Sequence, residues 1–192
     1  MEMRYGEPYY MIELSDSFIT KLETMVLGFD TTDAVVLSKD GVNPELSQLR
    51  SSKVSWLNDE ELSKSLLGVA LKVNSLSNWN LNLYDVEQPQ YTVYNSGDYY
   101  SWHIDQDPEV PNLEKRIRKL SMSLFLNEPK EYSGGELDLE LYSPDSDERS
   151  ESFKLSKGSA IFFPSDIWHR VRPVISGVRK TLVVWFGGPP YT

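Results

Sequence analysis

The sequence predicts a mainly β fold with helices in its N-terminal part, an α+β arrangement, and three observations support this. From about residue 83 onward, short segments alternate apolar and polar residues with period two, as strands do. Residues that favour turns, such as Gly, Pro, Asn and Asp, separate these segments. The first 82 residues contain two stretches with helical spacing of apolar side chains. Many short strands joined by turns are typical of a β-sandwich or barrel, so we expect such a core with supporting helices.

Two helices are expected before residue 80. Ser15 or Ser17 can cap the first helix, which runs to Leu27. The second helix begins at Asn58 or Asp59, where two glutamates follow and favour a helix N-terminus. Its apolar stripe, which we interpret as core packing, consists of Leu62, Leu66, Ala70 and Val73.

The strand predictions begin at residue 81. Period-two patterns predict strands at Leu81–Tyr84, Tyr91–Tyr94, Tyr99–Ile104, Lys119–Asn127, Glu136–Leu141, Glu151–Leu155, Ala160–Phe163, Trp168–Val171 and Lys180–Phe186. Turns are expected at Ser143–Asp145, Lys157–Gly158 and Ser176–Gly177, a hairpin turn at Gly134–Gly135, and an exposed loop at Lys39–Ser52. We therefore expect one domain over residues 1–192, with 1–82 as the support and 83–192 as the β core.

Composition and charge exclude several classes of protein. The chain has 29 acidic and 19 basic residues and a formal charge of −10, which disfavours nucleic-acid binding and binding to anionic membranes. It has no cysteine, so disulfide scaffolds, zinc ribbons and iron–sulfur clusters are excluded. The N-terminal segment lacks the apolar core of a signal peptide, and no window is apolar over a membrane-spanning length. We expect a soluble, cytoplasmic protein.

The first chemical signal is His103-Ile104-Asp105. Residues i and i+2 of a strand face the same side, so this imidazole and this carboxylate are expected to project together into the β core. His169, the only other histidine of the chain, lies at the start of a later predicted strand. Two histidines and one carboxylate can form a facial triad for ferrous iron, and zinc is an alternative metal. Asp107 shares the face of Asp105 and is an alternative ligand.

Arg179 offers a way to choose between these metals. It follows the Ser176–Gly177 turn and enters the last predicted strand. Its planar guanidinium can form a bidentate pair with a carboxylate, which is what an organic-acid cosubstrate of an iron enzyme would need. The alternative role for Arg179 is that of a surface ion-pair partner.

The segment from Tyr94 to Asp105, YNSGDYYSWHID, resembles the Y-x-x-G-x-x-Y-x-x-H-x-D signature of prolyl 4-hydroxylase-type 2-oxoglutarate/Fe(II)-dependent dioxygenases. The resemblance continues in the same order through Arg118–Asn127, Gly134–Leu137, Gly158–Pro164, His169–Val174 and Gly177–Arg179. It covers about half of the chain, from Tyr91 to Pro189. The ordered set of motifs is far more specific than any single motif.

The resemblance implies a double-stranded β-helix, or jelly-roll, fold. It implies that His103, Asp105 and His169 hold Fe(II), and that Arg179 binds the distal carboxylate of 2-oxoglutarate. By their place in the motif, Tyr94 would hydrogen-bond the cosubstrate, and Ser121 or Thr181 would contribute a hydroxyl group to the same carboxylate. Some peptidyl-prolyl hydroxylases carry a tyrosine on the central strand for that carboxylate, whereas this chain has Phe125 there.

The implied reaction consumes O2 and 2-oxoglutarate, releases succinate and CO2, and hydroxylates an unactivated C–H bond. The expected substrate is a peptidyl proline, hydroxylated at C4, in a peptide or protein partner. Another amino-acid side chain, a small molecule and a non-catalytic jelly-roll binding module are the alternatives. A requirement for ascorbate and the oligomeric state stay open. The likeness is greatest to small stand-alone bacterial and phage members, so a phage origin is open as well.

Overall fold

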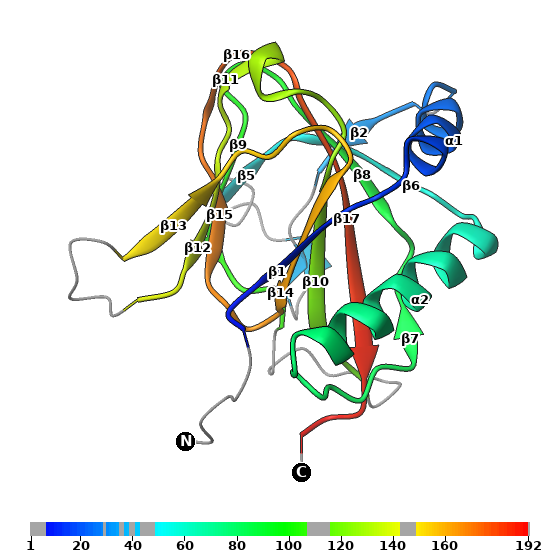
Figure 1. The fold of residues 1–192 in the computed structure, drawn as a ribbon. Coiled ribbons are helices and arrows are strands. Elements are labelled where there is room, and N and C mark those ends of the chain that lie inside the picture. Colours follow the sequence, from blue (N-terminus) through cyan, green and yellow to red (C-terminus); the bar gives the residue numbers. More distant parts are fainter. Residues whose placement is uncertain are drawn as a thin grey trace.

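A computed structural model describes residues 7–28, 30–34, 37–38, 41–42, 49–106, 116–142 and 149–191. The prediction of a mainly β jelly roll is confirmed: two antiparallel sheets face each other, and helices cover one of them (Figure 1). The major sheet has the order β1 (Tyr10–Glu13), β14 (Ser159–Pro164), β10 (Ile117–Phe125), β17 (Arg179–Gly188), β8 (Gln90–Tyr94), β6 (Lys53–Trp56), β2 (Thr32–Asp33), with β7 (Asp85–Val86) also paired to β17.

The minor sheet is smaller and carries the two histidines. Its order is β13 (Ser150–Phe153), β12 (Leu137–Glu140), β15 (His169–Val171), β9 (Tyr99–His103), β5 (Arg50–Ser51). Two further pairs are β11 (Tyr132–Gly134) with β16 (Val174–Gly177), and β3 (Leu37–Ser38) with β4 (Gly41–Val42). A 3-10 turn, η2 (Pro129–Glu131), precedes β11.

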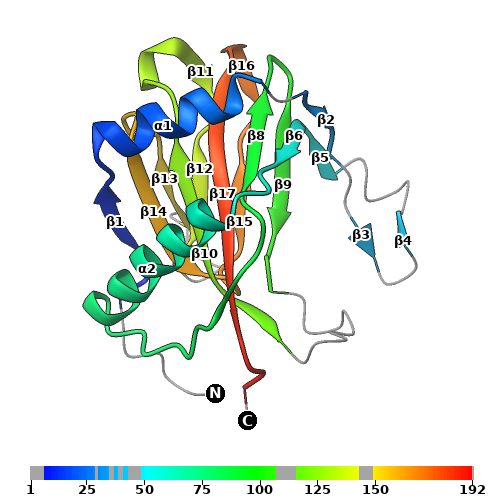
Figure 2. The ribbon, with the colours of Figure 1, turned by 90° about the vertical axis from the view of Figure 1, so that its right-hand side faces the viewer.

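Helices α1 (Asp16–Val26) and α2 (Glu60–Leu76) lie across the outer face of the major sheet (Figure 2). Both begin at a predicted cap: the side chains of Ser15 and Asp59 accept hydrogen bonds from the backbone N–H groups of Phe18 and Leu62. The expected stripe of α2 is buried, which confirms its interpretation as core packing. Neither of these helices is long and apolar enough to cross a membrane in the part of the chain that the structure describes.

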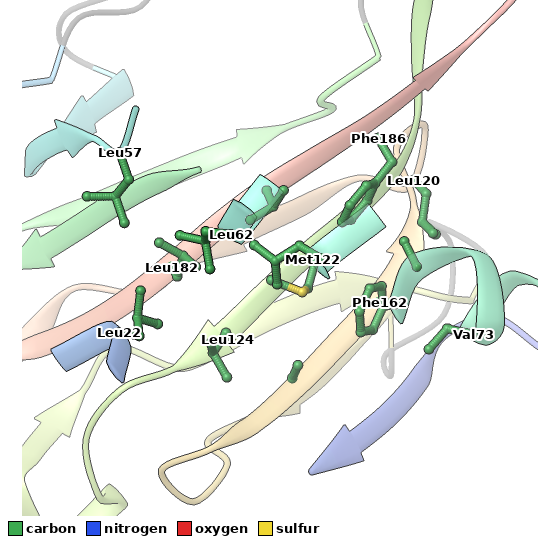
Figure 3. Packing of buried hydrophobic residues seen from close by; sticks show 14 of the residues in the cluster. Leu22, Leu57, Leu62, Val73, Leu120, Met122, Leu124, Phe162, Leu182 and Phe186 are labelled. Carbon is green, nitrogen blue, oxygen red and sulfur yellow. The ribbon is translucent and has the colours of Figure 1, made fainter. Parts of the chain in front are cut away.

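The alternation of side chains along the central strands produces two separate cores. On β10, Leu120, Met122 and Leu124 face the helices and join the residues of α1, α2, β14 and β17 in the outer core (Figure 3). Phe125 of the same strand joins the inner core between the two sheets, with Phe163 of β14. Because the side chains of a strand alternate between its faces, one strand supplies both cores. The inner face is therefore free to carry polar residues of a site.

The strand predicted at Leu81–Tyr84 was wrong. Leu83 is buried, but the segment has no strand pairing; instead, Leu81 exchanges two hydrogen bonds with the side chain of Asn74 in α2. An amide side chain can satisfy both backbone groups of a residue, so the segment needs no strand partner. The strand lies just beyond, at β7. Strands β1, β6, β11 and β16 were not predicted, because they are short or rich in polar residues.

The hairpin predicted at Gly134–Gly135 was also wrong. These glycines separate β11 from β12, which do not pair with each other: β11 pairs with β16, and β12 pairs with β13 and β15. Ser176 and Gly177, expected as a turn, are the end of β16, and part of the expected loop Lys39–Ser52 pairs with β9 as β5. Asp107 and the turn at Ser143–Asp145 lie outside the described residues.

Gly177 provides a test of the close packing between β11 and β16. Its φ is +78°, and a Cβ atom there would overlap the Glu131 carbonyl oxygen and lie 2.8 Å from the Cα atom of Tyr132. We predict that Gly177→Ala lowers the free energy of unfolding by about 2 kcal/mol or more, measured by urea denaturation. The control is Gly68→Ala in α2, where nothing lies within 4 Å of the new Cβ. That variant should gain about 0.5–1 kcal/mol of stability. Equal effects of the two substitutions would contradict this account.

Candidate metal centre and anion pocket

A pocket with about 440 Å³ of empty space, part of it open to solvent, lies between the inner faces of the two sheets. Its walls come from both sheets, and they include all three predicted metal ligands and Arg179. The minor sheet contributes the histidines through β9 and β15, which pair so that His103 and His169 stand opposite each other. Residues that are 66 positions apart are thus brought together by the antiparallel register.

His103, Asp105 and His169 form one cluster at this pocket. Their candidate ligand atoms all lie within 4.8 Å of one another. The Nε2 atoms of His103 and His169 lie 3.6 and 3.5 Å from the two carboxylate oxygens of Asp105. Nitrogen and oxygen atoms that converge in this way from three residues are a donor set for a divalent transition metal such as Fe(II) or Zn(II).

The orientation of both imidazoles is set by backbone carbonyl groups. The Nδ1 atom of His103 lies 2.8 Å from the Ser101 carbonyl oxygen, and that of His169 lies 2.9 Å from the Ile167 carbonyl oxygen. A carbonyl can only accept, so each Nδ1 carries the proton and each Nε2 keeps its lone pair. This is the arrangement of metal-binding histidines. The ring of Tyr100 stacks on His103, with 3.5 Å between ring centroids, and fixes that imidazole further.

Asp105 is positioned by a loop and not by a strand. Strand β9 ends at His103, and the backbone N–H of Asp105 donates instead to the Ser165 carbonyl oxygen. The Ser121 hydroxyl donates to the Asp105 carboxylate at 2.7 Å and also bonds the Ser165 hydroxyl. One carboxylate oxygen is thereby held from β10, which leaves the carboxylate group directed at the histidines.

The charges of the cluster favour a cation. Burial, helped by neighbouring His169 and opposed by Asp105, lowers the pKa of His103 to about 3, so its imidazole is neutral near pH 7. Burial alone would raise the pKa of Asp105. The charges of His169, His103 and Arg118 and the Ser121 hydrogen bond outweigh it, so that the pKa lies below its usual range. A buried carboxylate beside two imidazoles that direct Nε2 toward it is a site that favours a divalent cation.

Arg179 is buried at the start of β17, with 1% of its surface exposed. Its guanidinium carbon lies 5.2 Å from the ring centroids of both Tyr94 and Phe125, and its Nη1 donates to the Thr181 hydroxyl at 3.3 Å. Within the part of the chain that the structure describes, the Nε and Nη2 atoms have no hydrogen-bond partner that meets the usual geometry. A buried cation with free donors is unfavourable unless an anion satisfies it, so this part of the pocket suits an anion.

The predicted site residues thus fall into two groups. Tyr94 and Thr181 lie with Arg179, whereas Ser121 lies with Asp105, since its hydroxyl is hydrogen-bonded to that carboxylate. The sequence reasoning missed Ser165, whose backbone and hydroxyl position the Asp105 loop. The Phe163-Pro164-Ser165 break before His169 was its only signal.

Curated relatives of the chain carry the name PKHD-type hydroxylase. One from Teredinibacter turnerae is 27% identical over 179 residues, which is 91% of this chain and 77% of that protein. Others match over a shorter segment: one from Psychrobacter is 40% identical over 50% of this chain and 36% of the relative, and one from Hyphomonas neptunium is 41% identical over 50% and 41%. These last two matches span about two fifths or less of the relatives' length.

Solved structures of similar fold include a Pseudomonas putida prolyl-4-hydroxylase, with 20% identity, a TM-score of 0.67 and coverage of 93% of this chain and 91% of that chain. A viral collagen prolyl hydroxylase from Paramecium bursaria Chlorella virus-1 is 23% identical, with a TM-score of 0.66 and coverage of 95% and 97%. At such identities the likeness shows the shared jelly-roll fold.

A family model, described as the 2OG-Fe(II) oxygenase superfamily, matches residues 89–187. This range contains both histidines, Asp105 and Arg179, so it holds the metal cluster and the anion pocket together. It is also just over half of the 192-residue chain. The chain therefore belongs to the 2OG-Fe(II) oxygenase superfamily.

Proposed function

We propose that the protein is a dioxygenase that uses Fe(II) and 2-oxoglutarate to hydroxylate an unactivated C–H bond in a peptide, with a prolyl residue as the target. The observation that carries the proposal is the pairing of two features in one pocket: a His-Asp-His cluster for a divalent metal, and a buried arginine with two free donors for an acid. A structural metal site would have no use for the second feature.

His103, Asp105 and His169 would hold the iron. Their donor set fits: both imidazoles are held with Nε2 available, and the carboxylate is ionised. A metal with three protein ligands keeps open positions, and iron bound there with 2-oxoglutarate supplies the oxidation of a C–H bond by O2. The protein's own part is to orient the ligands, and Ser121 does this for Asp105.

Arg179 would bind the distal carboxylate of 2-oxoglutarate. Its buried Nε and Nη2 groups can donate two parallel hydrogen bonds to one carboxylate. The Thr181 hydroxyl next to it and the ring of Tyr94 limit the directions in which the guanidinium can turn. The cosubstrate would thus be oriented with its other end toward the metal cluster, in the same pocket.

A peptide substrate is favoured by the wall of the pocket that Trp185 forms. The indole N–H of Trp185 is buried and has no partner among the described residues, and the guanidinium of Arg118, itself paired with Glu87, lies 4.0 Å from the indole ring centroid. A free donor beside a cation suits a carbonyl oxygen, the acceptor that every peptide unit carries. Structural neighbours support a prolyl target, since one of them is a Trichoplax adhaerens prolyl hydroxylase in complex with a peptide fragment.

The direct experiment is an activity assay with Fe(II), 2-oxoglutarate and a library of proline-containing peptides, with and without ascorbate. We expect succinate to form in step with a 16 Da mass increase on a peptide. Mass added only to peptides without proline would favour another side chain as the target. The absence of succinate with every peptide and small-molecule pool would favour a non-catalytic binding module.

The first prediction concerns the metal cluster. Anaerobic addition of Fe(II) and 2-oxoglutarate should produce the weak visible charge-transfer band of an iron-bound 2-oxo acid. His169→Ala and Asp105→Ala should lose it, because removing one of three ligands abolishes most of the metal affinity. The matched control is Asp33→Asn, an exposed carboxylate on β2 that does not line the pocket, and the band should persist. A band in wild type that survives loss of His169 would refute this ligand set.

The second prediction concerns Arg179→Met, which replaces a buried cation by an apolar side chain of similar length. The affinity for 2-oxoglutarate should fall about 100-fold, since two charge-assisted hydrogen bonds are lost. The midpoint of thermal unfolding without cosubstrate should stay the same or rise, because an unpaired buried charge is removed. Calorimetric titration and a melting curve measure the two quantities. Unchanged affinity would refute the assignment of the cosubstrate pocket.

The third prediction concerns pH. Because the pKa of His103 is about 3 in the folded protein and near 6.5 when unfolded, only the unfolded chain takes up this proton between those values. The lowered pKa of Asp105 acts in the same direction at lower pH. The metal-free protein should therefore lose stability steadily from pH 7 to pH 5 in urea denaturation. His103→Leu should flatten this dependence. A metal-free protein that gains stability on acidification would show that His103 is not a buried neutral group.

A further inference from the structure

The hydroxyl group of Tyr132 is buried and has no hydrogen-bond partner in the described part of the chain. The side chain is 5% exposed, and its hydroxyl is one of only a few buried side-chain atoms left unpaired there. Two of the others are the Nε and Nη2 atoms of Arg179. A buried phenol normally finds a partner, so an unpaired one beside an unpaired cation needs an explanation.

Gly135 lets these two side chains approach its backbone closely. A Cβ atom on Gly135 would lie 3.1 Å from Cδ of Arg179, 3.3 Å from Cε2 of Tyr132 and 3.0 Å from Cγ2 of Val174. Any side chain at this position would therefore fill the space that Arg179 and Tyr132 share. The φ of +67° at Gly135 also favours glycine.

The electrostatic relation of the two groups agrees with this closeness. Burial raises the pKa of Tyr132, and the positive charge of Arg179 and a side-chain hydrogen-bond interaction with it oppose that rise. The guanidinium bonds Thr181 through Nη1 and also interacts with the phenol, but among the described residues Nε, Nη2 and the phenol oxygen have no partner at full hydrogen-bonding geometry. The phenol oxygen can accept from Arg179. Its own proton then remains available for an acceptor group that enters the pocket.

The ring of Tyr132 is held in place from behind. The ammonium group of Lys154 lies 4.4 Å from the ring centroid and donates to the Tyr132 carbonyl oxygen at 2.8 Å. The backbone of Tyr132 pairs with Gly177, which lies two residues before Arg179. Strands β11 and β16 therefore lie at the end of the sandwich where β17 begins (Figure 1). A fixed donor loses little conformational entropy on binding.

We propose that the hydroxyl group of Tyr132 is the second donor, beside Arg179, to the distal carboxylate of the 2-oxo acid. This rests on the proposed function and deepens it. The O–H group donates to one carboxylate oxygen while its own oxygen accepts from the guanidinium, so all the unpaired atoms of the cluster are satisfied at once. A hydroxyl group at position 125, where this chain has Phe125, is then not needed to bind the carboxylate. Together, Arg179 and Tyr132 would favour 2-oxo acids that carry a second carboxylate over those that do not.

The experiment compares two ligands on Tyr132→Phe. Binding of 2-oxoglutarate and of 2-oxopentanoate, which lacks the distal carboxylate, is measured by anaerobic calorimetry on the Mn(II)-loaded protein. We expect 2-oxoglutarate to bind about five- to tenfold more weakly, the loss of one hydrogen bond to a charged group, and 2-oxopentanoate to bind as it does to wild type. The melting midpoint without ligand should not fall. Tyr84→Phe, an exposed tyrosine outside the pocket, is the matched control and should change nothing.

The double variant Phe125→Tyr/Tyr132→Phe provides a second test. The ring of Phe125 also lies 5.2 Å from the Arg179 guanidinium carbon, so a hydroxyl group there should recover part of the 2-oxoglutarate affinity. Unchanged 2-oxoglutarate binding by Tyr132→Phe would overturn the inference, as would equal weakening for both ligands, which indicates a structural role. If wild type binds 2-oxoglutarate and Arg179→Met does not, either of these results for Tyr132→Phe refutes only the role of Tyr132 and leaves the proposed function standing. If wild type binds no 2-oxoglutarate, the proposed function itself falls.

Discussion

The site depends on one constraint, the strict alternation of side chains on the central strands of the major sheet. On β17, Leu182, Val184 and Phe186 pack under the helices, while Arg179 and Thr181 point into the space between the sheets. The outer residues supply the apolar burial that stabilises the sheet. A shift of one residue in register would exchange the two faces and place the arginine under the helices. The fold and the pocket are therefore fixed by the same pattern.

Alternation is also why much of the fold was predictable. Period two on β8, β10, β12, β14 and β17 reflects burial on at least one face, and such strands were found close to their true bounds. The capped helices were found for a similar local reason. Structure held by distant partners was not predicted: Leu81 is bonded by the side chain of Asn74, and Gly134 ends strand β11, which pairs with β16 and not with β12. No local pattern encodes such partners.

The candidate site shows the same division. His103, Asp105, His169 and Arg179 were identified from residue type, order and resemblance, and the structure brings them to one pocket. The groups that orient them were not foreseeable. Carbonyl oxygens of the main chain set the imidazoles, and Ser165 holds the Asp105 loop through backbone contacts from a segment 60 residues away. Backbone groups are the same in every residue type, so their roles appear only with the tertiary structure.

The two ends of the pocket carry opposite charges, and this should couple the binding of a metal to the binding of an acid. The metal end is a buried carboxylate beside two imidazoles, and the other end is a buried guanidinium whose Nε and Nη2 atoms have no partner among the described residues. Each end is unfavourable alone, because a buried charge without a partner loses hydration. A divalent cation would satisfy the first and a carboxylate would satisfy the second, while the proposed cosubstrate, a 2-oxo diacid, would contact both. Binding of metal and of such an acid should therefore reinforce each other, since each neutralises charge that the other must approach.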